Sequence, residues 1–142
     1  MSTRANIKIT DGRNTLWFYR HSDGYPEGAL PTLNRFMDWL RSSAIRDNVG
    51  QAAGWLVVIG HQEYAGHLEP GDRNSGMGWK VGAYEPTTGL HGDTEYLYTI
   101  DLAAKTLKCQ SIDRDYGTPP DYKNKPKVSY GTVNLNKAKL TL

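Results

Sequence analysis

The chain has 142 residues, a formal net charge of +2 and one cysteine, Cys109. This length is typical of a single domain with an ordinary hydrophobic core, and a lone cysteine excludes an intrachain disulfide. The near-neutral charge excludes an acidic mimic of nucleic acid. No apolar run approaches the roughly 18 residues that span a bilayer, and the first residues lack the apolar stretch of a signal peptide. We therefore expect a protein of the cytoplasm.

The net charge hides an asymmetry along the chain. Residues 1–117 carry 12 Lys/Arg and 14 Asp/Glu, whereas residues 118–142 carry five lysines and one aspartate. We expect a single α+β domain over residues 1–114, followed over residues 115–142 by a Pro/Lys-rich linker and a basic C-terminal strand or tail.

The first elements have the pattern of a β-hairpin. Residues 5–9 alternate with period two, Asp11 and Gly12 supply turn chemistry, and residues 15–20 are aromatic and strand-like. Residues 21–28 hold two glycines, a proline and an Asp-Gly step, which predicts a loop.

Two helices are predicted next. From Pro31, the residues Leu33, Phe36, Met37 and Leu40 share one helical face, which predicts a helix ending near residue 43. Residues 47–64 are ambiguous, because their β-branched centre would suit a buried strand. Apolar residues keep near-helical spacing over about 16 residues, longer than most strands, so we favour a buried helix.

The second half is predicted to be mostly strand. Residues 66–78 have the composition of a loop, and residues 79–85, 95–100 and 106–111 alternate and predict a β-meander. Apolar residues from 128 to 135 indicate a last short strand or hairpin. The expected fold is α+β: a mostly antiparallel sheet of about five strands, made of a hairpin, two helices and a meander, with both helices on one face.

Two loops of similar composition are the strongest functional signal. His21 and Asp23 precede Tyr25 in the first loop, and His91 and Asp93 precede Glu95 in the second. At one edge of the sheet they would bring imidazoles and carboxylates together, which suits a divalent metal or the general acid and base of phosphoester hydrolysis. Asp before Gly is also ordinary turn chemistry. We favour the turns and expect no cofactor, with a divalent metal as the alternative.

Arginines beside these loops indicate a possible anion site. Arg4, Arg20 and the helix start after Gly28 could receive a phosphate or carboxylate, or the two arginines could pair with Asp23, Glu27 or Asp93 and hold the loops. A base could stack on Tyr25, Tyr84, Tyr96 or Tyr98. The candidate ligand-binding residues are Arg4, Arg20, His21, Asp23, Tyr25, His91, Asp93 and Glu95.

The basic C-terminal end is a separate candidate, for nucleic acid. Its lysines could contact phosphates nonspecifically, although a solvated terminus has the same composition and is the interpretation we favour. These lysines are Lys123, Lys125, Lys127, Lys137 and Lys139.

Three stretches resemble a family of short proteins carried by bacteriophages and prophages. They are Ser-Thr-Arg-Ala at residues 2–5, His-Ser-Asp-Gly-Tyr-Pro at residues 21–26 and Leu-His-Gly-Asp-Thr-Glu-Tyr at residues 90–96. The similarity covers about residues 1–111 and transfers no catalytic residues, because we know of no established activity for that family. It implies a viral accessory protein working in a bacterial cytoplasm.

The expected function is therefore binding without catalysis. We expect an antagonist of host defence that recognises a host macromolecule or a small anionic, nucleotide-like ligand, and that does not bind membranes. A metal-dependent phosphoesterase or nuclease using the His21/Asp23 and His91/Asp93 loops is the first alternative. A nucleic-acid binder acting through the lysines is the second, and a homo-oligomer is compatible with each.

Overall fold

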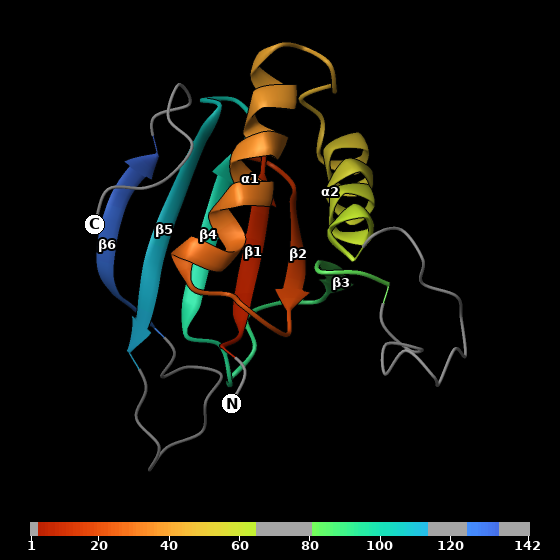
Figure 1. Ribbon diagram of the computed structural model, residues 1–142. Coiled ribbons are helices and arrows are strands. Elements are labelled where there is room, and N and C mark those ends of the chain that lie inside the picture. Colours follow the sequence, from red (N-terminus) through yellow and green to blue (C-terminus); the bar gives the residue numbers. More distant parts are fainter. Residues whose placement is uncertain (1–2, 65–80, 114–124, 134–142) are drawn as a thin grey trace.

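Two α-helices pack on one face of a six-stranded β-sheet in the computed structural model, which describes residues 3–64, 81–113 and 125–133 (Figure 1). The strand order is β3-β2-β1-β4-β5-β6. All neighbouring strands are antiparallel except β1 and β4, which are parallel. The strands are β1 (Ala5–Thr10), β2 (Thr15–Arg20), β3 (Glu85–Thr87), β4 (Tyr96–Asp101), β5 (Thr106–Asp113) and β6 (Lys125–Val133). The predicted α+β class, with a mostly antiparallel sheet, is confirmed.

The predicted hairpin is confirmed as β1 and β2. The Asp11 carboxylate closes its turn by accepting hydrogen bonds from the backbone N–H groups of Arg13 and Asn14, at 2.9 and 2.7 Å. These bonds, with that of Asn14 the larger, hold the pKa of Asp11 below its ordinary value. Gly12 has a φ of 93°, which suits glycine in a tight turn.

Helix α1 (Pro26–Arg41) begins five residues before the predicted start at Pro31. Pro26 lies in the first turn, where its missing N–H costs nothing, so the first of the two prolines starts the helix and Pro31 lies inside it. The predicted face of Leu33, Phe36 and neighbouring apolar residues is buried. The expected end near residue 43 is close to the observed one.

Helix α2 (Val49–Glu63) confirms the helical interpretation of the ambiguous segment. The Asn48 side chain caps it by accepting a hydrogen bond from Gln51 N–H at 2.8 Å. Ala52, Leu56 and Ile59 are fully buried against the sheet. Helical spacing of small and apolar residues therefore outweighed the β propensity of the valines and isoleucine.

The predicted meander over residues 79–85, 95–100 and 106–111 is wrong in its first strand. Residues 79–80 lie outside the described residues, and residues 81–84 are not a strand: Gly82 has a φ of 146°, and Ala83 N–H bonds to Gly60 O at 3.0 Å. Strand β3 begins only at Glu85. It pairs with β2 and forms one edge of the sheet, with β6 at the other edge. Strand β4 does not neighbour β3. It pairs with β1, and the two strands are parallel.

The last described strand extends the sheet. Strand β6 is antiparallel to β5, which confirms a strand in the region of residues 128–133. The predicted loop over residues 66–78 and residues 115–124 of the predicted linker lie outside the described residues. The linker prediction is wrong for residues 125–127, which belong to β6. Within the described part of the chain, no helix combines the length and apolarity needed to cross a membrane.

The sheet has one face buried by the helices. Ile7 of β1 lies between Phe18 of β2 and Tyr98 of β4, and all three belong to the core beneath the helices. Because side chains alternate along a strand, their neighbours Asn6 and Tyr19 lie on the other face. No helix among the described residues covers that open face (Figure 1).

Candidate functional site

The two predicted loops meet at one end of the central strands, where β1 and β4 begin and β2 ends. Ala5 pairs with Arg20 on one side and Tyr96 on the other, so the loops that follow β2 and precede β4 are brought together. The ring of Tyr19 contacts both imidazoles. It packs edge-on against His21 with centroids 4.5 Å apart, and it stacks on His91 at 4.1 Å.

Hydrogen bonds and ion pairs join these rings to charged groups. Tyr19 Oη donates to Asp93 Oδ2 at 2.7 Å, and Arg4 Nε lies 3.4 Å from the same oxygen. His21 Nε2 lies 3.0 Å from Glu85 Oε1. We call this group the open-face cluster. Its residues are Arg4, Tyr19, His21, Glu85, Thr87, His91 and Asp93.

The second loop is fixed to the sheet by a buried amide. Asn6 is fully buried; its Nδ2 donates to Phe18 O at 2.9 Å and Gly89 O at 3.2 Å, and its Oδ1 accepts from His91 N–H at 2.7 Å. His91 Nε2 is 2.6 Å from Thr87 Oγ1. The His91 ring is therefore held from two sides and keeps its position on Tyr19.

The cluster has a buried floor and an exposed rim. Tyr19 is 4% exposed, whereas the side chains of Arg4 and His21 are 40% and 33% exposed. Burial, and then the hydrogen bond to Asp93, raise the pKa of the Tyr19 phenol well above its ordinary value. The phenol therefore stays protonated and donates to Asp93, while Arg4 and His21 face solvent.

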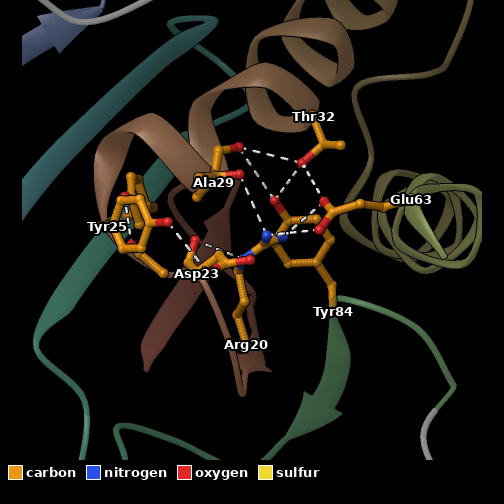
Figure 2. Close-up of polar contacts among 10 residues, drawn as sticks. Arg20, Asp23, Tyr25, Ala29, Thr32, Glu63 and Tyr84 are labelled. Carbon is orange, nitrogen blue, oxygen red and sulfur yellow. Dashed lines mark hydrogen bonds and ion pairs between the residues drawn. The ribbon is translucent and has the colours of Figure 1, made fainter. Parts of the chain in front are cut away.

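Arg20 lies on the opposite, helix-covered face (Figure 2). Only 1% of its side chain is exposed, and its Nη1 and Nη2 bond to the Glu63 carboxylate at 2.9 and 2.7 Å. Its Nε donates to Asp23 O at 3.1 Å, and Nη2 also donates to Gly28 O at 3.3 Å. This bidentate pair joins β2 to the end of α2 and the start of α1.

Polar and aromatic groups complete the surroundings of Arg20. Its guanidinium lies 5.1 Å from the centroid of the Tyr84 ring, and Tyr84 Oη is 2.6 Å from Thr32 Oγ1 (Figure 2). Thr32 Oγ1 also donates to Glu63 Oε1 at 3.2 Å. Of the anticipated arginine pairings, Arg4 with Asp93 is present, but the carboxylate partner of Arg20 is Glu63, on an element that the sequence did not place beside it.

The rest of the predicted ligand-binding set is dispersed. Asp23, with a φ of 55°, accepts a hydrogen bond from Tyr25 Oη at 3.3 Å at the start of α1, beside Arg20 (Figure 2). Glu95 acts through its backbone, which donates to Arg4 O and accepts from Ile112 N–H, each at 2.8 Å. Its side chain is exposed.

The predicted stacking tyrosines do not form a platform. Tyr84 and Tyr98 are fully buried, and Tyr98 Oη donates to Gly24 O at 2.7 Å. A different ring is better placed: Trp17, two residues before Tyr19 on the open face, is partly exposed, and Lys8 Nζ lies 5.6 Å from its ring centroid. The sequence analysis missed Trp17 because only the strand register shows which face it occupies.

The structure does not assemble the proposed metal set. Among residues 3–64, 81–113 and 125–133, no three His, Cys, Asp or Glu side chains are grouped so that they could hold a metal ion. The hydrogen bonds of Asp23 are with Arg20 and Tyr25, not with either histidine. Lys125 and Lys127 lie in β6, but their side chains are outside the described part of the structure, as are Lys123, Lys137 and Lys139 altogether.

Comparison of this chain with protein-family models, with curated proteins and with solved structures finds no match in any of the three.

Proposed function

We propose that the protein acts by binding, without catalysis, and that the open-face cluster holds a small anionic, nucleotide-like ligand. The observation that carries this proposal is the convergence of His21 and His91 on Tyr19 beside Arg4. The His21 imidazole and the Arg4 guanidinium form one exposed rim, and phosphate oxygens favour donors of these two kinds.

Each carboxylate of the cluster faces one of its donors. Asp93 faces Arg4 and Tyr19, and Glu85 faces His21. Each carboxylate therefore orients one donor. Arg4 contacts Asp93 through Nε, and the fork of its terminal amino groups is the part that suits a phosphate.

An aromatic surface for a base lies beside this rim. Trp17 is two residues from Tyr19 on the same strand face, which is about 7 Å at the rise of a β-strand. Lys8 Nζ lies over the Trp17 ring, 5.6 Å from its centroid, and adds a positive charge there. A base on Trp17 and a phosphate at Arg4 and His21 fit one nucleotide lying along β2.

The resemblance to phage and prophage proteins supports a role in the infected cell. Sequestering a nucleotide signal of the host would antagonise a defence system without any chemical step. A host protein is the alternative partner. The phosphoesterase alternative gains no support from the placement of Asp23, and nucleic-acid binding through the C-terminal lysines stays a prediction.

Calorimetric titration with AMP, ATP and a cyclic dinucleotide tests the proposal. We expect at least one of them to bind and to be recovered unchanged. Arg4→Ala and His21→Ala should each weaken binding at least tenfold, whereas Arg13→Ala, in the exposed turn between β1 and β2, should not. Absence of binding by the whole panel, an equal loss in Arg13→Ala, or hydrolysis of the bound nucleotide would overturn it.

A further inference from the structure

Helix α2 has exposed apolar side chains on the side that faces away from the sheet, beside glycines and the polar residues Gln51, His61 and Gln62. Its inner side is buried, as expected, but Trp55 and Val58 are 40% and 39% exposed. A helix that covers a sheet usually has a polar outer side. An exposed apolar strip on a protein of this size typically marks an interface.

An apolar groove continues this surface down to the sheet. It has a volume of about 230 Å³, and Leu16 at its rim is 41% exposed. The groove is lined by Leu16, Trp17, Phe18, Ala53, Gly54, Val57, Pro86 and Thr87. Pro86 has no N–H to offer at the sheet edge, which disfavours addition of a partner strand and favours a partner that packs through side chains.

We infer that the outer side of α2 pairs with the same side of a second copy of this chain, with the two helices antiparallel and crossing at Gly54. The outer side has residues spaced three, four and three positions apart, as along the seam of two packed helices. These residues are Gln51, Gly54, Val58 and His61. Around a two-fold axis at Gly54, Val58 lies over Gly50 of the second copy.

The glycines leave room for this approach. A Cβ atom built at Gly54 would meet no described atom within 4 Å, and one at Gly50 would meet only Asn48 Oδ1, at 3.9 Å. Trp55 would lie beside Trp55 of the second copy on one flank, and the two grooves would meet on the other. Apolar side chains therefore face each other at the centre and flanks of the contact, and Gln51 and His61 lie toward its ends.

Charge complementarity selects the antiparallel arrangement. Arg46 and Asp47 precede α2, and His61 and Glu63 lie in its last turn. Antiparallel pairing places Asp47 opposite His61 of the second copy, whereas the carboxylate of Glu63 is already held by Arg20. It also brings the positive end of each helix dipole beside the negative end of the other. Parallel pairing would place like charges and like dipole ends together.

Sedimentation equilibrium of the full chain tests the dimer. We expect a dimer in the micromolar range, and Val58→Asp should raise its dissociation constant at least 30-fold while the circular dichroism spectrum stays that of the wild type. Tyr25→Asp is the matched control, because Tyr25 is 37% exposed but lies at the start of α1. A wild-type monomer, or a Val58→Asp dimer as stable as the wild type, would overturn the inference.

A cysteine at the predicted axis tests the geometry. With helix axes 8–10 Å apart, the two Gly54 Cα atoms would be about 3.5–5.5 Å apart, and the upper part of this range permits a disulfide. Gly54→Cys should give a covalent dimer under mild oxidation. Gly89→Cys should not, although a Cβ there also meets no described atom within 4 Å. Equal cross-linking of the two variants would refute the antiparallel contact, and this result is independent of the ligand proposed above.

Discussion

Replacing Glu63 by glutamine isolates the charge that balances buried Arg20. The Arg20 side chain is 1% exposed and depends on Glu63 for two short contacts, at 2.7 and 2.9 Å. Breaking a buried ion pair costs about 3–5 kcal/mol. Glu63 is 23% exposed, so water can replace part of the lost interaction, and glutamine keeps one acceptor. We therefore expect the free energy of unfolding to fall by about 2–3 kcal/mol.

Urea denaturation, followed by tryptophan fluorescence and circular dichroism, measures this loss. For a chain of this size the melting temperature should fall by about 6–12 °C. Glu95→Gln removes an exposed carboxylate and should change stability by less than about 0.5 kcal/mol. If Glu63→Gln were as stable as Glu95→Gln, Arg20 would not depend on this pair, and the account of how β2, α1 and α2 are joined would be wrong.

Three further predictions concern the core. Gly60→Ala should lower the free energy of unfolding by about 1–3 kcal/mol in urea titrations, because its Cβ would lie 2.8 Å from Tyr84 N; unchanged stability would mean that this contact relaxes freely. Burial raises the pKa of Cys109 to about 12, so an aromatic disulfide reagent at pH 8 should label the native protein at least 100-fold more slowly than the urea-unfolded chain. Burial also raises the pKa of Tyr84 to about 12 against about 10 when unfolded. The protonated phenol therefore contributes to the free energy of unfolding in full below pH 10, and this contribution is lost as the pH rises toward 12. Tyr84→Phe should accordingly lose less stability than the wild type between pH 9 and pH 11.5.

Local patterns predicted most of the elements. Period-two alternation with an Asp-Gly turn identified the β1–β2 hairpin, and helical spacing from Val49 to Ile59 identified α2. The strand predicted over residues 79–85 was wrong because the alternation there is interrupted by Gly82, in a conformation that only glycine adopts readily. The meander failed with it, since pairing partners across the sheet are not encoded in local periodicity.

The candidate site was predicted in part, for a similar reason. The sequence left open whether the loops of His21 and His91 share an edge of the sheet and favoured ordinary turns, and the parallel pairing of β1 with β4 brings them to one edge. Strand alternation then separates Arg20 from Tyr19, one on each face of the sheet. Tyr19, which joins the two histidines, was missed because an aromatic strand residue has the pattern of ordinary packing.

The most direct test of the proposed binding site is a nuclear magnetic resonance titration of the imidazole signals with the tightest nucleotide of the panel. The signals of His21 and His91 should shift together with one midpoint, because both rings contact Tyr19. His61, on α2, should not shift. A nucleotide that shifts His61 alone, or shifts only one of the two rings on Tyr19, would contradict a single site at this edge of the sheet.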